Sequence, residues 1–406
     1  MMGICAPRPM TPLRLTRFTA VSAVGRGLAE TLDALEQQRS GLAPCAFETV
    51  DIETHIGEVP GVDATALPQA LRGFNCRNNR LAQLALMQDG FTDAVATSAD
   101  HWGPRRVGVF LGTSTAGILE TELAYRARGS ATGELPKDFN YAATHNSFSV
   151  ADFVRQALQL DGPAAVVCTA CSSSAKVFAS AQRMISAGVI DAAVVGGVDS
   201  LCLTTLYGFH SLQLTSRTPC RPFDVARDGI SIGEAAAFVL LERPPSRLDG
   251  DTIMLLGTGE SSDAYHMSSP HPEGRGARAS IQQALKAANL APGDIDYINL
   301  HGTATASNDS AEDLAVTSVF GTGTACSSTK GATGHALGAA GALEAVICAL
   351  AIQHGLTPGG LNTTEVDPKL NLHYLCENRR GGLRRVLSNS FGFGGANCSL
   401  IFGRAA

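Results

Sequence analysis

Short runs of apolar residues, separated by glycines and polar segments, recur along the whole chain. Their length of four to six residues and their flanking glycines favour buried β-strands. Longer alanine-rich segments at 175–187 and 336–350 instead predict helices. Buried strands that alternate with helices predict an α/β fold, in which stacked sheets have helices packed on and between them. The predicted strands are 107–112, 164–167, 192–197, 237–241, 295–300 and 399–402.

Three pairs of similar segments occur in the same order in the two halves of the chain. We interpret them as two copies of one α/β unit, joined within 243–251. The predicted domains are 1–246, which carries a candidate nucleophile, and 247–406, which carries two candidate histidines. The similar segments are T-A-C-S-S at 169–173 and 324–328, G-E-A-A-A-F-V-L-L-E-R at 233–243 with G-G-A-N-C-S-L-I-F-G-R at 394–404, and L-G-T-S-T at 111–115 with H-G-T-A-T at 301–305.

Composition and charge narrow the class of protein. Hydrophobic residues make up 45% of the 406 residues and charged residues 17%, as in a globular protein. The formal net charge of −6 argues against nucleic-acid binding, because phosphate contacts need an excess of lysine and arginine. The chain has no run of eighteen apolar residues, and the segment 18–25 is too short for a signal peptide. We therefore expect a cytoplasmic protein without a membrane span.

Cys171 lies between a predicted strand at 164–167 and a predicted helix at 172–187. A turn of this kind exposes its side chain, and a helix N-terminus favours an anion, so we expect a thiol of lowered pKa. Two other interpretations stay open: a buried structural cysteine, or a redox pair with Cys168. The eleven cysteines are scattered, as in a reducing compartment, and no second C-x-x-C completes a zinc site.

His301 and His335 differ from the other eight histidines because glycine and small residues flank them, which lets a ligand approach closely. Either could still be an ordinary structural histidine. The chain has only five lysines beside 26 arginines. A lysine at position 330 therefore indicates that a compact ammonium, rather than any positive charge, is needed there. Glu312 is a possible partner for that ammonium, and a plain surface lysine is the alternative.

These residues lie in motifs that resemble the β-ketoacyl-acyl carrier protein synthases of types I and II, condensing enzymes of the thiolase superfamily. The resemblance extends from the first predicted strand to S-N-S-F-G-F-G-G-A-N (388–397). It implies a five-layered αβαβα fold made of two duplicated halves, and a dimer. The motifs are T-A-C-S-S, P-F-D-V-A-R-D-G (222–229), D-A-Y-H-M-S-S-P (263–270), H-G-T-A-T, K-G-A-T-G-H-A-L-G-A-A-G (330–341) and G-F-G-G-A-N.

The resemblance also implies a role for each candidate residue. Cys171 would accept an acyl group from a carrier protein, and His301 and His335 would bind the malonyl thioester as it loses carbon dioxide. Backbone N–H groups of Cys171 and Phe393 would form the oxyanion hole, and Lys330 would orient the site. No metal or bound cofactor is expected, because the phosphopantetheine arm of the carrier protein holds the substrates. The further residues are Thr303 and Thr305 for that arm, Thr115, Phe209 and Phe391 for the substrate pocket, and Asp309 and Glu312 as structural support.

Two features concern substrates and partners. Thr115 stands where the family often has a bulky aliphatic residue, which favours a dedicated pathway such as polyene or polyketide synthesis over bulk fatty-acid synthesis. The segment 71–80 holds arginines without an acidic residue, so we expect it to dock an acidic acyl carrier protein. The predicted docking residues are Arg72, Arg77, Arg80 and Arg217.

Two other functions remain possible at this stage. The chain could be a non-catalytic partner that resembles a chain-length factor and shapes the acyl tunnel of another ketosynthase. The intact Cys171, His301, His335 and Lys330 argue against a scaffold. A thiolase is the third possibility, and it would require Cys398 as a second catalytic cysteine. The sequence is compatible with a homodimer or with a heterodimer formed with a chain-length-factor-like subunit.

Overall fold

The computed structural model describes residues 10–405, whose strands form two packed sheets joined at one edge. The join is the antiparallel contact of β1 with β10, where only Leu13 pairs with Leu255 and Arg14 with Met254. The first sheet has the order β6 (Ala164–Val167), β5 (Val107–Gly112), β7 (Ala192–Asp199), β9 (Ala235–Glu242) and β1 (Leu13–Ser22). The second has the order β14 (His373–Tyr374), β12 (Ala325–Ser327), β11 (Tyr297–Asn299), β16 (Arg385–Gly392), β17 (Ala396–Arg404) and β10 (Ile253–Ser262).

The two sheets repeat one pattern of strand order and direction. In each sheet three neighbouring strands are parallel, β6–β5–β7 in one and β12–β11–β16 in the other. Two antiparallel strands follow them, β9 and β1 or β17 and β10. The predicted duplication is therefore confirmed, and the segment 243–251 lies in the connection between β9 and β10.

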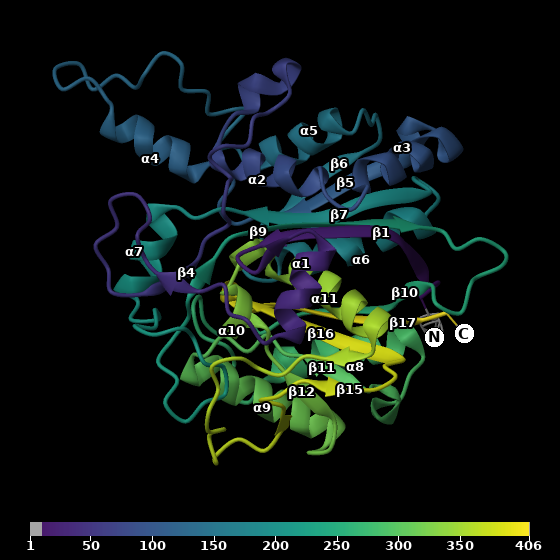
Figure 1. Ribbon diagram of the computed structural model, residues 1–406. Coiled ribbons are helices and arrows are strands. Elements are labelled where there is room, and N and C mark those ends of the chain that lie inside the picture. The colour runs from purple at the N-terminus through teal and green to yellow at the C-terminus, as the bar shows by residue number, and fades with distance from the viewer. Residues whose placement is uncertain (1–9, 406) are drawn as a thin grey trace, which may run out of the picture.

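Helices complete five layers (Figure 1). Helices α6 (Ser173–Ser186) and α11 (Ala340–His354) lie between the sheets, where α6 packs on β5 and β7 and α11 on β9 and β16. The outer face of the first sheet carries α2 (Arg77–Leu86), α3 (Phe91–Trp102) and α5 (Phe148–Ala157). The outer face of the second sheet is covered by α8 (Arg275–Ala288), against which α9 (Ala306–Phe320) packs.

Helix α11 is apolar on every side except at Glu344, and the layers around it bury every residue from Ala340 to Ile352. The segment Leu337–His354 is long and apolar enough to span a membrane, yet 89% of it is buried inside the protein. Such burial is what a central helix of a layered α/β protein requires. The predicted helix at 336–350 begins later than expected, because a 3₁₀ turn at Leu337–Ala339 precedes it.

The predicted strands at 107–112 and 164–167 coincide with β5 and β6. One expectation is wrong, since all four residues of β6 are half-exposed. The reason is its place at the edge of the sheet, where only β5 pairs with it. The remaining elements are β2 (Gly25–Arg26), α1 (Leu28–Glu36), β3 (Ala43–Pro44), β4 (His55–Gly57), α4 (Ile118–Arg126), α7 (Leu203–Ser211), β8 (Ile232–Gly233), α10 (Lys330–Thr333), β13 (Leu356–Thr357), β15 (Arg379–Arg380) and the 3₁₀ turns Gln69–Phe74, Pro104–Arg106, Pro292–Asp294 and Phe393–Gly395.

Candidate active site

Cys171 lies on the turn between β6 and α6, directly before the helix N-cap Ser172. The preceding Ala170 has a φ of 51°, an unusual conformation for a residue with a side chain, which turns the chain sharply. Ser173 stabilises this turn, since its N–H and its hydroxyl both donate to the Ala170 carbonyl, at 3.1 and 2.6 Å. The thiol is thus directed into the space between the two halves, and Cys171 is only 5% exposed.

The expected low pKa of Cys171 is wrong for the free protein. Burial raises the pKa of the thiol to about 12, against the opposing effects of the Lys330 charge and of the backbone N–H groups of Phe393 and Cys171. The nucleophile is therefore a neutral thiol at pH 7. Those two N–H groups lie close to the sulfur.

The two histidines meet the cysteine from the other half of the protein. His301 follows β11, and His335 lies between α10 and the 3₁₀ turn before α11. The Nε2 atom of His335 is 3.0 Å from the Cys171 sulfur, and the His301 and His335 ring centres are 5.3 Å apart. Burial, together with the nearby Lys330 charge, lowers the pKa of both histidines well below its usual range. Both imidazoles are therefore neutral, so each can donate one N–H.

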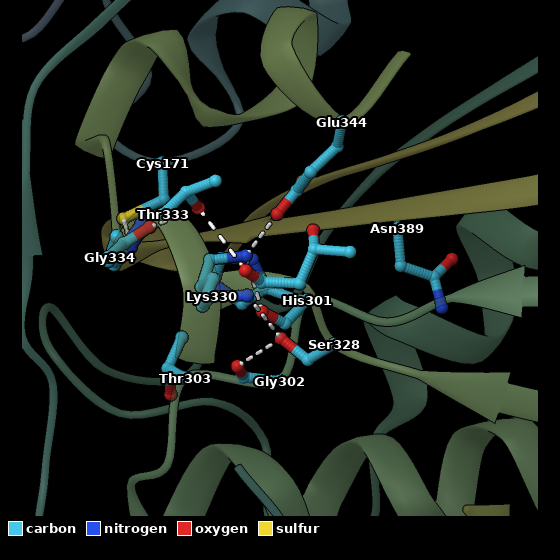
Figure 2. Close-up of polar contacts among 12 residues, drawn as sticks. Cys171, His301, Gly302, Thr303, Ser328, Lys330, Thr333, Gly334, Glu344 and Asn389 are labelled. Atoms are coloured by element: carbon cyan, nitrogen blue, oxygen red, sulfur yellow. Dashed lines mark hydrogen bonds and ion pairs between the residues drawn. The ribbon is translucent and has the colours of Figure 1, made fainter. Parts of the chain in front are cut away.

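Lys330 lies beside His301 and Glu344 (Figure 2), and its side chain is buried. Its Nζ atom donates to the His301 carbonyl at 2.5 Å and forms an ion pair with Glu344 of α11. The proposed pairing with Glu312 is thus wrong. Glu344 lies on the helix that packs directly against the site, whereas Glu312 faces the backbone of the His301 loop.

Glu312 and Asp309 of α9 hold the loop that carries His301. The Glu312 carboxylate accepts hydrogen bonds from the N–H groups of His301 and Gly302, both at 2.8 Å. Asp309 accepts from the N–H groups of Thr303 and Phe223, at 3.1 and 2.9 Å. Both acids are fully buried, so the supporting role predicted for them agrees with their contacts.

A cavity opens from Cys171 and the two histidines towards the surface. Thr303 and Thr305 line it, and their hydroxyls are 2.9 Å apart. Phe209, Phe391 and Phe393 form apolar walls, where the Phe209 and Phe393 rings pack at 5.6 Å. Thr115 is not part of this lining. Its side chain turns away because its hydroxyl and N–H both donate to the buried Asp199, each at 2.9 Å.

The predicted docking arginines differ in their surroundings. Arg77 is only 4% exposed and forms a buried ion pair with Glu234, so it is not available for docking. Its guanidinium is buried because it pairs with Glu234, which lies 157 residues away in the sequence. The residues around Arg77 therefore do not predict its burial. Arg80 is partly exposed and bonds to Asn75 and Asp63. Arg72 and Arg217 are exposed.

The sulfur of Cys171 and the nearest ring nitrogens of His301 and His335 lie within 4.8 Å of one another, close enough to hold a soft metal ion. The Lys330 charge next to them opposes a bound cation. Two other cysteines weighed from the sequence do not join this cluster. Cys168 is exposed, and Cys398 is fully buried within β17.

Comparison with known proteins now places this site in a family. Residues 77–247 match the N-terminal domain of β-ketoacyl synthases, and residues 253–364 match their C-terminal domain. The chain is 33% identical over 409 residues to 3-oxoacyl-[acyl-carrier-protein] synthase 2 of Coxiella burnetii, covering 96% of this chain and 98% of that protein. The chain belongs to the β-ketoacyl synthase family.

Other β-ketoacyl synthases match a part or the whole of the chain. The mitochondrial 3-oxoacyl-[acyl-carrier-protein] synthase of Arabidopsis thaliana is 40% identical over 259 residues, which is 59% of this chain but only 56% of that protein's length. A ketosynthase solved with its chain length factor from Xenorhabdus doucetiae has 38% identity and a TM-score of 0.88, covering 97% of this chain and 98% of that one. A β-ketoacyl synthase from Burkholderia phymatum has 29% identity and a TM-score of 0.85, covering 98% and 100%.

The sequence analysis missed two acids of this β-ketoacyl synthase site. Glu344 pairs with Lys330, and Asp199 binds the loop that contains Thr115. A signal for Glu344 was present, since it is the only charged residue in the otherwise apolar segment 336–350. A buried charge of that kind needs a partner. Asp199 ends an apolar strand and had no comparable signal.

Proposed function

We propose that the protein catalyses a decarboxylative Claisen condensation that lengthens an acyl chain by two carbons. In the first half-reaction the Cys171 sulfur attacks an acyl thioester of a carrier protein. A new carbon–sulfur bond forms at Cys171, and the carrier thiol leaves with the proton that Cys171 has lost. The observation that carries this proposal is the buried thiol, which contacts the neutral His335 and faces two backbone N–H groups.

In the second half-reaction a malonyl thioester of the carrier protein loses carbon dioxide. The electrons of the broken carbon–carbon bond pass to the thioester carbonyl, where the N–H groups of His301 and His335 stabilise the enolate oxygen. The enolate carbon then attacks the acyl carbonyl on Cys171. The N–H groups of Cys171 and Phe393 stabilise the tetrahedral oxyanion until the carbon–sulfur bond breaks and the β-ketoacyl product leaves.

Neutral histidines suit this step better than charged ones. The Lys330 charge disfavours their protonation, which is the role that we assign to it. No proton is then transferred to the enolate carbon ahead of the attack. Thr303 and Thr305 would hydrogen-bond the phosphopantetheine arm of the carrier, while Phe209 and Phe391 would contact the acyl chain. The protein itself would need no metal or bound cofactor.

Two features of the surface indicate the partners of the protein, a carrier protein and a second subunit. The exposed Arg72 and Arg217 would attract an acidic acyl carrier protein, with Arg80 as a weaker contributor. The edge of β6 is apolar, half-exposed and without a partner strand within the described chain, so it would pair with the same edge of a second subunit. That subunit would be a second copy or a chain-length-factor-like relative. We place the enzyme in cytoplasmic fatty-acid or related polyene or polyketide biosynthesis.

Intact-protein mass spectrometry tests the reaction directly. The protein is incubated with a panel of acyl-carrier proteins, and then malonyl-carrier protein is added. We expect an acyl adduct that disappears as a β-ketoacyl product two carbons longer forms. The Cys171→Ala variant should form no adduct, whereas the matched Cys168→Ala variant should react normally. A wild-type protein that forms no adduct with any primer would contradict the proposal and support a non-catalytic partner subunit.

A further inference from the structure

A further buried carboxylate, Asp199, lies beside the catalytic groups without taking part in the chemistry proposed above. It ends β7 and is fully buried. Its charge acts on Cys171, whose pKa it helps to raise. Burial raises the pKa of Asp199, and the groups that bond to it within the described chain are all donors, which oppose this rise.

One oxygen of Asp199 organises the loop after β5. Its Oδ1 atom accepts from the Thr113 hydroxyl at 2.6 Å, from the Ser114 N–H at 2.7 Å, and from the Thr115 N–H and hydroxyl, both at 2.9 Å. The Ser114 hydroxyl in turn donates to the carbonyl of Ala170 at 3.3 Å, directly before Cys171. This oxygen therefore connects Asp199 to the turn that carries the nucleophile.

The other oxygen reaches the segment that carries a catalytic histidine. The Oδ2 atom of Asp199 accepts from the Gly338 N–H at 2.5 Å, three residues after His335. The other end of this segment is fixed by His335 itself, whose N–H donates to Ser231 and whose carbonyl accepts from Gly233. Leu337 between them has a φ of 47°, so the chain turns sharply to present the Gly338 N–H to the carboxylate.

Gly338 permits this contact because it has no side chain. A Cβ atom at this position would lie 2.7 Å from Asp199 Oδ2 and 2.6 Å from the Ser114 hydroxyl oxygen, closer than real contacts allow. Backbone of the C-terminal half thus touches the loop of the N-terminal half at one point, with Asp199 between them.

From this arrangement we infer that Asp199 is a positioning residue, which sets the distance between Cys171 and His335 by holding the loops of both. This inference rests on the proposed function only where it predicts that Asp199 affects the rate of the catalysed reaction. The contact between the thiol and the imidazole exists in the free protein, so it can be tested without any substrate.

Two variants break the contact in different ways. In Asp199→Asn the amide oxygen keeps the four donors of the first loop, but the amide NH₂ faces the Gly338 N–H, so donor meets donor. In Gly338→Ala the carboxylate and its charge remain, and the added methyl group pushes the segment of His335 away. Asp313→Asn serves as the matched control, because Asp313 is also buried and, among residues 10–405, its carboxylate bonds to Asn371 and Leu372 and not to the loops of the site.

The rate of Cys171 alkylation by iodoacetamide at pH 8 reports the contact. The thiol titrates far above this pH, so the rate follows its small ionised fraction. An N–H donated by the His335 Nε2 atom, 3.0 Å from the sulfur, would favour that ionised form. We expect Gly338→Ala to lower the rate at least about threefold, and the same change to have no effect in a His335→Ala background. The Asp313→Asn control should stay within about twofold of the wild type. Circular dichroism and thermal unfolding establish that each variant is folded.

An equal loss with and without His335 would overturn the inference, because it would show a general structural effect. So would a Gly338→Ala rate equal to that of the wild type. Decarboxylation of malonyl-carrier protein is the second measurement, in which Asp199→Asn should lower the rate at least about tenfold. If wild-type protein does not decarboxylate at all, the proposed function fails, while the alkylation result still decides whether Asp199 positions His335.

Discussion

At the residue scale, Lys330 adds to the effect of burial on the two histidines and opposes the effect of burial on Cys171. Its ammonium disfavours the protonated form of both histidines and favours the ionised form of Cys171, and Glu344 balances it. Because the pair is buried, removing one partner leaves an uncompensated charge. The stability of the protein and the chemistry of the site therefore depend on the same ammonium, but they can be separated by experiment.

Replacing Lys330 with methionine should lower the free energy of unfolding by about 3–5 kcal/mol, because Glu344 then lacks a partner. Condensation should also be lost. In the double variant Lys330→Met/Glu344→Leu, apolar packing replaces the pair, so most of the stability should return while activity does not. Urea unfolding and product formation measure the two effects. A double variant with wild-type activity would contradict the role given to the ammonium.

The pH dependence of alkylation tests the state of the thiol. Since burial raises the pKa of Cys171 to about 12, its ionised fraction grows with pH throughout the neutral range. The rate with iodoacetamide should rise about tenfold per pH unit from 7 to 9, without a plateau. Mass spectrometry of the alkylated protein measures this rate. A plateau near pH 7 would instead show that the turn before α6 lowers the thiol pKa, as the sequence alone suggested.

At the element scale, the close packing of α6 against α11 limits the size of the side chains between the two helices. Gly341 of α11 faces Ala175 of α6, and a Cβ atom at 341 would lie 2.8 Å from the Ala175 backbone nitrogen. Alanine normally favours a helix over glycine by up to about 1 kcal/mol. At this position the crowding outweighs that gain, since overpacking typically costs about 1–3 kcal/mol.

Gly341→Ala should therefore lower the midpoint of thermal unfolding. Its matched control is Gly208→Ala in α7, where no atom lies within 4 Å of an added Cβ. That substitution should leave the midpoint unchanged or raise it. Differential scanning calorimetry of both variants gives the comparison, and a stabilised Gly341→Ala protein would show that the contact between the helices is looser than described.

The bounds of helices and strands could be predicted from the sequence where the residues of one short segment determine them. β5 and β6 coincide with their predicted ranges, since Gly112 ends the first apolar run and Pro163 directly precedes the second. The motifs also selected Cys171, His301 and His335, which the fold brings together. Burial and pairing were not predictable, because they depend on segments far apart in the sequence. Arg77 is buried by Glu234, and Lys330 selects Glu344 rather than Glu312 since α11 packs against it.

At the scale of the whole molecule, we propose that a second subunit pairs with the edge of β6 that has no partner strand within the described chain. A lysine in place of the half-exposed Val166 should prevent β6 from pairing with another chain, because its charge would be buried in the interface. Sedimentation velocity should show a dimer for the wild type and a monomer for Val166→Lys. Val189→Lys, at an exposed position away from this edge, should remain dimeric. A wild-type monomer would instead favour assembly with a related subunit.

The pattern of the two sheets has a consequence for the origin of the site. Cys171 comes from the first copy of the α/β unit, whereas His301 and His335 come from the second. Neither copy on its own contains both the cysteine and the two histidines. If a gene fusion joined two identical ancestors, those ancestors could build such a site only across two chains, and twice by symmetry. On this interpretation the fused chain would have kept one of these sites, and under the proposed reaction each half would serve one reactant.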